Sequence, residues 1–202
     1  MTIRVKFCGM TRVEDAVQAA DLGVSAIGLI FVERSPRAVT LSQAREICRA
    51  LPPLVQVVGL FMDAPRERVE SVLGQVPLNW LQFHGDETPE YCAGFGRPFI
   101  KALPMASPDD VQYHHWEQAS ALLLDGHAAG AMGGSGSTFD WRRAELPARP
   151  WILAGGLTPD NIAEAVDLLK PDAVDAASGV ETAPGIKSAE LMKRFMEKIR
   201  NG

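Results

Sequence analysis

Two side chains in this sequence could exchange protons with a substrate, a cysteine near the start of the chain and an aspartate in its second half. Cys8 ends the apolar run "IRVKFC", and Asp125 ends the run "ALLLD". A carboxyl group among aliphatic side chains loses hydration, which raises its pKa and lets it remain protonated as a general acid. A thiol is a base only when ionised, and an ordinary thiol has a pKa of about 8.5. Cys8 therefore needs a nearby cation, and Lys6, two residues earlier on the same face of a strand, is the candidate.

Each of these residues also has a simpler interpretation. Cys8 could be a small apolar core residue, and Asp125 could cap a helix or pair with a cation. Cys48 and Cys92 are predicted to be structural, because Cys48 belongs to the apolar stripe of an expected helix and Cys92 falls within another. Three widely spaced cysteines without a CxxC motif argue against a disulfide framework and against a cysteine zinc site.

Glycine-rich segments form a second group of candidates. They are "LAGGLTPDN" (153–161), "ASGVE" (177–181) and "MGGSGSTF" (132–139). Glycine has no Cβ, so the backbone N–H groups of such a loop can approach an anion closely. A tight turn explains any one glycine pair equally well. Three glycine loops after consecutive strands favour a phosphate-binding site.

Further polar residues fall at or just after other apolar runs. His84 ends "NWLQFH" and could contact a substrate or only bond to a backbone group. Arg37 follows "SAIGLIF" in the segment "RSPR". Lys101 could be an inward-pointing Schiff-base lysine, but pairing with a carboxylate across the barrel is the favoured interpretation. The remaining histidines show no ligand spacing, and we expect no metal.

The elements that must position these residues alternate regularly along the chain. Eight apolar runs of strand length end at intervals of 19 to 30 residues, at Cys8, Phe31, Phe61, His84, Leu103, Asp125, Gly155 and Ala177. Helical stripes lie between several of them, such as Val13, Ala16, Val17 and Ala20 at i, i+3, i+4 and i+7. Eight βα units in about 200 residues are at the lower size limit of a (β/α)8 TIM barrel, in which active sites lie at the C-terminal ends of the strands. An open doubly wound sheet is the rival, but it more often has five or six strands.

Local signals predict where several helices begin. Thr11 and Glu14 have the spacing of a capping box. Pro65, Pro89 and Pro159 are each predicted to lie in a first helical turn, where proline's missing N–H is harmless.

Composition limits the possible partners. The chain has 202 residues, of which 47% are hydrophobic, and we expect one α/β domain over residues 1–202. A net charge of -5 without a basic cluster argues against nucleic acid as a partner. The N-terminal residues lack a signal-peptide core, and no apolar run approaches the roughly 20 residues of a membrane helix. We therefore expect a cytoplasmic protein with no membrane partner.

Seven segments in register resemble the phosphoribosylanthranilate isomerase family, from Arg4 to about Ser188. They are "KFCGMTRVEDA", "AIGLIFVERSPRAVT", "LQFHGDE", "LLLDG", "GGSGSTFDW", "LAGGLTPDNIAEAV" and "VDAASGVETAPGIKS". The resemblance implies a (β/α)8 barrel enzyme of tryptophan biosynthesis that needs no metal or cofactor. It also implies a small phosphorylated substrate, and we expect a monomer because most relatives are monomers.

The resemblance carries roles onto matching positions. It implies that Cys8 is the general base, that Asp125 is the general acid and that Arg37 meets the anthranilate carboxylate. The implied phosphate-binding positions are Gly155, Gly156, Ser178 and Gly179, with Gly134 and Gly136 nearby. The implied reaction is an Amadori rearrangement. Asp125 would protonate the ribose ring oxygen of N-(5'-phosphoribosyl)anthranilate, and Cys8 thiolate would remove the C2' proton.

The sequence departs from the family pattern at two positions. Ser137 stands where relatives often have lysine, and Ala177 where they often have serine, but both leave the backbone donors in place. Rival interpretations are a sugar-phosphate epimerase, a Schiff-base aldolase using Lys101, and a barrel that binds a phosphorylated metabolite without turnover. Cys8 stands where barrels that also isomerise a histidine-pathway aminoaldose usually have aspartate, which argues for the tryptophan-pathway substrate alone.

Overall fold

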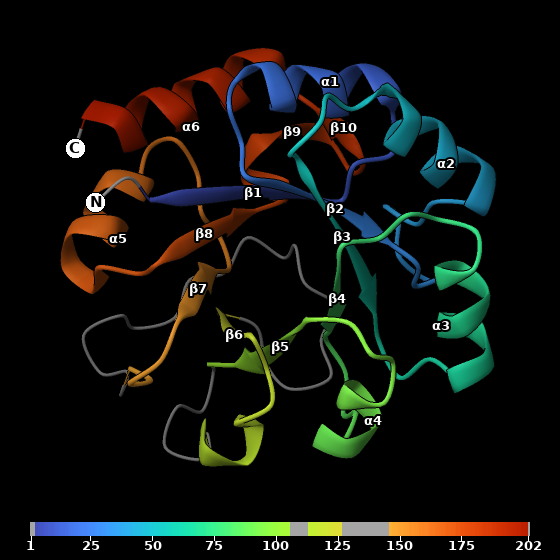
Figure 1. Cartoon of the computed structure of the whole chain (residues 1–202). Coiled ribbons are helices and arrows are strands. Elements are labelled where there is room, and N and C mark those ends of the chain that lie inside the picture. The colour runs from blue at the N-terminus through green and yellow to red at the C-terminus, as the bar shows by residue number, and fades with distance from the viewer. Residues whose placement is uncertain (1–2, 106–112, 127–145, 202) are drawn as a thin grey trace.

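The structure is a computed structural model, and it describes residues 3–105, 113–126 and 146–201. In this part of the chain, eight parallel strands follow one another around a closed barrel, in which β1 pairs with both β2 and β8 (Figure 1). The predicted (β/α)8 barrel is therefore confirmed, and the open sheet is excluded because its two edges are paired. The predicted phosphate-loop positions Gly134 and Gly136, and the departure at Ser137, lie outside the described residues.

The observed strands end within one residue of the predicted positions. They are β1 (Arg4–Cys8), β2 (Ala26–Ile30), β3 (Gln56–Phe61), β4 (Trp80–Phe83), β5 (Phe99–Pro104), β6 (Ala121–Asp125), β7 (Trp151–Ala154) and β8 (Ala173–Ala176). The helices on the outside of the barrel are α1 (Val13–Asp21), α2 (Leu41–Ala50), α3 (Arg66–Leu73), α4 (Pro89–Ala93), α5 (Ile162–Leu169) and α6 (Ala189–Asn201). Short 3-10 turns, η2 (Tyr113–Trp116) and η3 (Ser178–Val180), and a hairpin of β9 (Glu181–Ala183) and β10 (Ile186–Lys187) complete the described elements.

Alternation along each strand sorts side chains between two cores. On β6, Leu122 and Leu124 belong to the large cluster between strands and helices, whereas Leu123 belongs to a smaller cluster inside the barrel. Successive side chains of a strand point to opposite faces, so Asp125 shares the inner face with Leu123. On β1, Val5 and Phe7 belong to the outer cluster. Lys6 and Cys8 therefore share the inner face, as their spacing predicted.

The side-chain cap predicted at the start of α1 is wrong. Arg12 is the N-cap of α1 and makes no side-chain capping bond, so the capping box predicted at Thr11 and Glu14 does not form. The Thr11 hydroxyl instead donates to the carbonyl of Gly185, on the turn between β9 and β10. This partner is 174 residues away, which a local motif cannot anticipate. The structure places a capping box at Thr40, the N-cap of α2.

The three prolines differ in their positions. Pro89 is the first residue of α4, as predicted, and Pro65 is the N-cap of α3. Pro159 lies in a turn before α5, which begins only at Ile162, so the prediction that it lies in a first helical turn is wrong.

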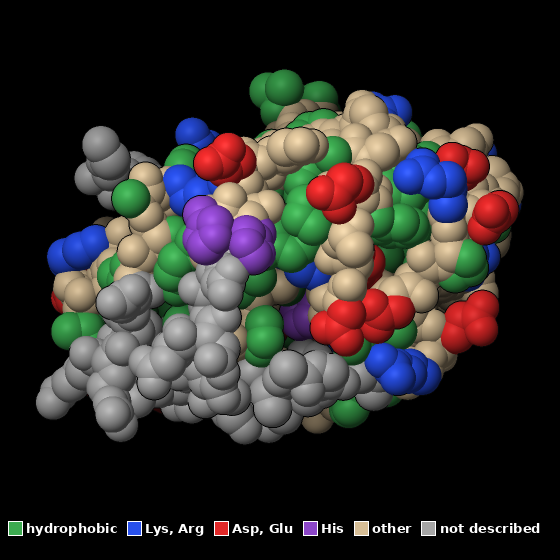
Figure 2. Space-filling model, turned by 90° about the horizontal axis from the view of Figure 1, so that it is seen from below, with side chains coloured by type: hydrophobic (Ala, Val, Ile, Leu, Met, Phe, Trp, Pro, Cys, Tyr) green, Lys and Arg blue, Asp and Glu red, His purple; other side chains and the backbone are tan. Residues whose placement is uncertain are grey.

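The structure also bears on the expectations about membrane helices and about a basic surface. Among the described helices, none has the length and apolar character required to cross a membrane. On the face seen in Figure 2, acidic and basic side chains are interspersed, and the described residues of that face form no continuous basic surface.

Candidate active site

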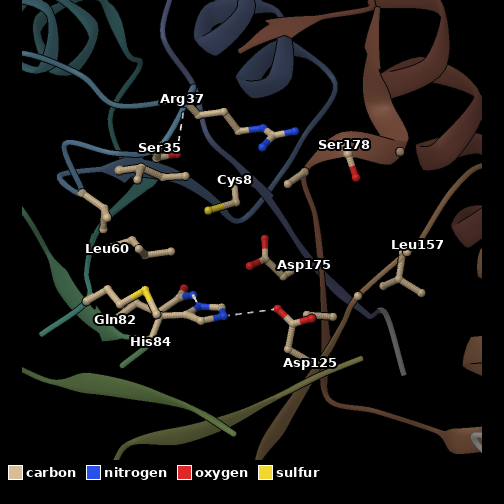
Figure 3. Close-up of a pocket in the computed structure, with 18 residues that line it drawn as sticks. Cys8, Ser35, Arg37, Leu60, Gln82, His84, Asp125, Leu157, Asp175 and Ser178 are labelled. Carbon is tan, nitrogen blue, oxygen red and sulfur yellow. Dashed lines mark hydrogen bonds and ion pairs between the residues drawn. The ribbon is translucent and has the colours of Figure 1, made fainter. Parts of the chain in front are cut away.

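A cavity lies at the C-terminal ends of the strands and brings the predicted site residues together (Figure 3). Including the open solvent at its mouth, the space between the residues that line it is about 740 Å³. All the described residues that the sequence singled out for catalysis or binding line it, namely Cys8, Arg37, His84, Asp125, Gly155, Gly156, Ser178 and Gly179. Apolar side chains, including Ile30, Val32 and Leu60, complete its wall.

Cys8 is buried at the end of β1, with its side chain turned into this cavity. The neighbouring residue across the ladder is Gly28 of β2. A Cβ atom at Gly28 would lie 2.6 Å from the Cys8 sulfur, so only glycine leaves room for the thiol in this position. Burial raises the pKa of Cys8 above its ordinary value, although the cations of Lys6 and Lys187 oppose this shift.

Lys6 forms a buried ion pair with Asp175 of β8, with 2.6 Å between Nζ and Oδ2. Its charge also acts on the Cys8 thiol, which shares the inner face of β1 with it. Burial alone would lower the pKa of Lys6, but Asp175 and Cys8 together raise it. Asp175 was missed in the sequence, where it is one of two aspartates in "DAVDAA" and nothing local marks it.

Asp125 lies next to His84 on the other side of the cavity. The two groups are 3.4 Å apart, measured from His84 Nε2 to Asp125 Oδ2. The amide nitrogen of Gln82 lies 3.4 Å from His84 Nδ1. If the Gln82 amide donates to Nδ1, the imidazole proton stands on Nε2, the nitrogen that faces Asp125. His84 therefore contacts the proposed acid, and a purely backbone role does not describe it.

Arg37 is held by Glu181, a partner that the sequence did not reveal. Its Nε lies 3.0 and 3.1 Å from the two carboxylate oxygens, and its Nη2 lies 2.8 Å from Oε2. One edge of the guanidinium is thus fixed, and within the described residues Nη1 makes no hydrogen bond. Burial opposes ionisation of Glu181, but hydrogen bonds from Arg37 and the charge of Lys187 hold its pKa below the usual value.

Lys187 connects Glu181 to the ends of two barrel strands. Its buried ammonium lies 2.8 Å from Glu181 Oε1, 2.6 Å from the Cys8 carbonyl and 3.0 Å from the Ala177 carbonyl. Burial lowers the pKa of Lys187, and the charge of Glu181 counteracts that effect. The hairpin β9–β10 therefore fastens the end of β1 at Cys8, the loop after β8 and Arg37 to one another.

The glycine loops after β7 and β8 lie against each other. Gly155 and Gly156 have φ values of 87° and 61°, a left-handed conformation that favours glycine. A Cβ atom at Gly179 would overlap the carbonyl oxygen of Leu157. The Asn161 amide holds the Gly156 carbonyl at 2.9 Å. These close approaches keep side chains out of this part of the cavity wall and leave backbone exposed, as a phosphate site requires.

Lys101 lies outside the described lining of the cavity. Its ammonium is 2.8 Å from the Glu87 carboxylate and also donates to the Gly85 carbonyl. The predicted pairing with a carboxylate is therefore confirmed, but its predicted place across the barrel is wrong, because Glu87 follows β4, the strand next to β5. Glu87 in turn accepts from the backbone N–H of Asp63 and of Gly85, so this pair fixes the loop that follows His84.

The described residues also bear on metal binding. Across residues 3–105, 113–126 and 146–201, no three His, Cys, Asp or Glu side chains are grouped as ligands of a metal ion. The cavity is lined by one thiol, two carboxyl groups, one imidazole and a fixed guanidinium. The first three kinds of group can donate or accept protons, and the guanidinium can bind an anionic group of a ligand.

Known proteins resemble the chain over nearly its whole length. Residues 5–198 match the family model of N-(5'phosphoribosyl)anthranilate (PRA) isomerase. The isomerase of Nitrosococcus oceani is 52% identical over 202 residues, covering 98% of each chain. The crystal structure of the Thermus thermophilus isomerase matches with a TM-score of 0.88 at 39% identity, covering 98% of this chain and 99% of that one. A further isomerase, solved in complex with reduced 1-(o-carboxyphenylamino)-1-deoxyribulose 5-phosphate, matches with a TM-score of 0.85 at 33% identity, covering 99% and 100%.

Proposed function

Because the chain belongs to the N-(5'-phosphoribosyl)anthranilate isomerase family of tryptophan biosynthesis, we propose that its cavity converts N-(5'-phosphoribosyl)anthranilate into 1-(2-carboxyphenylamino)-1-deoxy-D-ribulose 5-phosphate. The observation that carries this proposal is the pairing of Cys8 and Asp125. They stand at the ends of β1 and β6 and line one cavity with Arg37 and two glycine loops. An aldose-to-ketose isomerisation needs one acid and one base that face the same sugar.

The two anionic ends of this substrate have separate sites in the cavity. We assign the phosphate to the backbone of Gly155, Gly156, Ser178 and Gly179, and the anthranilate carboxylate to Arg37. Glu181 occupies the Nε–Nη2 edge of Arg37, so the carboxylate is assigned to Nη1. The relative solved with a reduced aminoketose phosphate carries a ligand with the same two groups, which supports a cavity that accepts both.

Between these ends, the ribose would lie against the two proposed catalytic residues. In Figure 3, Cys8 lies between Arg37 and the pair formed by His84 and Asp125. Protonated Asp125 gives its proton to the ribose ring oxygen, and the C1'–O bond breaks as the nitrogen forms a protonated Schiff base. Cys8 thiolate then removes the C2' proton, and the electron pair forms the C1'=C2' bond of an enolamine.

The protonation states follow from the neighbours of each group. The charge of Lys6 favours the thiolate, whereas burial favours the neutral thiol and is the larger effect. The thiolate is therefore a minor but strongly basic species. His84 contacts the carboxyl group of Asp125 and is assigned to orienting it toward the ring oxygen.

An isomerase assay tests the proposal. N-(5'-phosphoribosyl)anthranilate is generated in place, and the aminoketose is quantified by chromatography for the wild type, Cys8→Ala and Asp125→Asn. Each variant is expected to lose about 10²–10⁴-fold in kcat, the usual contribution of a general acid or base. Cys48→Ala is the matched control, because Cys48 is remote from the cavity lining, and it is expected to turn over normally.

The outcomes separate the rival interpretations. A folded wild-type protein that gives no product would leave only a barrel that binds a phosphorylated metabolite. Near-normal turnover by Cys8→Ala or Asp125→Asn would disprove the assigned role of that residue while leaving the reaction intact.

A further inference from the structure

Asp175 presents an unpaired, buried acceptor to the cavity. Its side chain is 7% exposed, and Oδ2 is taken by Lys6. Within the described residues, Oδ1 has no hydrogen-bond partner. A buried carboxylate oxygen without a donor has lost its hydration and gained nothing in return, which is unfavourable. Such an atom in the wall of a binding cavity indicates a ligand group that donates to it.

The position of Asp175 identifies which part of a sugar it faces. Figure 3 shows its carboxylate between Cys8 and Asp125, directed into the cavity. Lys6 holds Asp175 Oδ2, and the charges of both residues act on the Cys8 thiol that lines the same cavity, so the carboxylate and the thiol are neighbours of one ammonium. A substrate carbon that contacts the Cys8 sulfur therefore has its own hydroxyl group within reach of Asp175.

We propose that Asp175 is a third catalytic residue of the isomerisation and that its Oδ1 takes the proton of the C2' hydroxyl as the enolamine becomes the ketone. This inference rests on the proposed function, in which Cys8 acts at C2'. Lys6 holds Oδ2 and so turns Oδ1 toward the hydroxyl. Neither Lys6 nor Arg37 can accept a proton in its cationic form, and Asp125 is assigned to the ring oxygen.

The step balances in atoms and electrons. The enol O–H bond breaks and its proton joins Oδ1 of Asp175, while the oxygen electron pair forms the C2'=O bond. The C1'=C2' electron pair takes the proton from the Cys8 thiol, which restores the thiolate and yields the C1' methylene. Asp125 has lost a proton and Asp175 has gained one, so a single proton exchange through water resets the site.

Asp175→Asn tests this assignment, because the amide keeps the size of the side chain but cannot take a proton. We expect kcat to fall about 10²–10⁴-fold and KM to change less than about fivefold. The assay is run in D₂O, and unreacted substrate is recovered for mass spectrometry. Since the enolamine can no longer become a ketone efficiently, the Cys8 thiol returns deuterium to C2', and label accumulates in recovered substrate well above the wild-type level.

Two comparisons keep the result interpretable. Asp167→Asn makes the same chemical change at an exposed residue of α5, whose ion pair with Lys170 lies at the surface, and it is expected to match the wild type. If Asp175→Asn does not fold because Lys6 loses its partner, the double variant Lys6→Met/Asp175→Asn, which removes both charges, is read by the same two measurements.

The outcomes are distinct. Slow turnover with added label supports the inference. Turnover within about threefold of the wild type, or slow turnover without added label, overturns it and leaves the proposed function standing. A wild-type protein that forms no product overturns both.

Discussion

At the scale of single residues, the protonation of Cys8 is the property on which the proposed chemistry depends. Burial is the largest influence on its pKa and raises it, while Lys6 and Lys187 act in the opposite direction. The charged side chains around the thiol have a net charge of about one positive unit. Lys6, Lys187 and Arg37 carry three positive charges against two on Asp175 and Glu181. A thiolate at Cys8 would neutralise this group, which explains how a buried sulfur can be ionised during turnover.

The rate of Cys8 alkylation is predicted to follow this balance. Only the thiolate reacts with iodoacetamide, so the rate at Cys8 should rise with pH, with a midpoint above the ordinary thiol value of about 8.5. Lys6→Met removes the nearest cation and should move the midpoint to still higher pH. Mass spectrometry of the Cys8 peptide measures the rate, and the Cys48 peptide is the internal control, since burial raises the pKa of Cys48 to about 11. A midpoint below pH 7 would contradict the assignment.

At the scale of elements, β2 is fitted to the thiol that it faces. Gly28 lies beside Cys8 in the ladder, and a methyl group there would be 2.6 Å from the sulfur and 3.1 Å from the Cys8 Cα. The contribution of β2 to the site is therefore space: the missing side chain of Gly28 leaves room for the Cys8 sulfur. This role has no sequence signal, because "AIGLI" reads as an ordinary buried strand.

Gly28→Ala is predicted to displace the Cys8 sulfur and to lower kcat by at least about 100-fold, since a misplacement of 1 Å can have that effect. Steady-state assays measure the change, and circular dichroism checks that the barrel is retained. Gly74→Ala is the matched control, because a Cβ atom at Gly74 meets its nearest neighbour at an ordinary 3.5 Å. Equal activity in the two variants would show that the thiol has room to move.

The hairpin β9–β10 shows what sequence patterns can and cannot reveal about elements. The eight strands were predictable because each is a short apolar run and their intervals repeat. The hairpin was not, because its ends, Glu181 and Lys187, gain their meaning only from Arg37, 144 residues away, and Cys8, 179 residues away. The capping box expected at Thr11 failed for the same reason, since Gly185 takes its hydroxyl.

The same distinction applies to the candidate site. Cys8 and Asp125 could be found because each ends an apolar run, and the glycine loops because glycine is itself a conformational signal. Asp175 could not be found, since its partner Lys6 is 169 residues away and it stands within a strand. Residues that line the cavity were thus partly predictable, whereas the charges that support them required the fold.

At the scale of the whole molecule, the buried ion pair of Lys101 and Glu87 affects the stability of the fold, and neither residue lines the cavity. Both side chains are 4% exposed or less, and Glu87 also accepts two backbone N–H groups. Removing one member of such a pair leaves an uncompensated buried charge, which typically costs about 3–5 kcal/mol.

Lys101→Met is therefore predicted to lower the free energy of unfolding by about 3–5 kcal/mol, measured by urea denaturation. Lys170→Met is the control, because the ion pair of Lys170 with Asp167 is mostly exposed and such pairs contribute about 0–1 kcal/mol. A loss at Lys101 no greater than at Lys170 would show that the pair is dispensable to the barrel.

The link from Lys187 to the Cys8 carbonyl also orders events during synthesis of the protein. Cys8 leaves the ribosome long before Lys187, which comes 179 residues later. A nascent chain that has just completed β8 holds every barrel strand, the proposed acid and the proposed base, yet Arg37 lacks its carboxylate anchor. Catalytic competence would then arrive only after the barrel strands are complete, and a chain truncated after residue 180 would be expected to stay inactive.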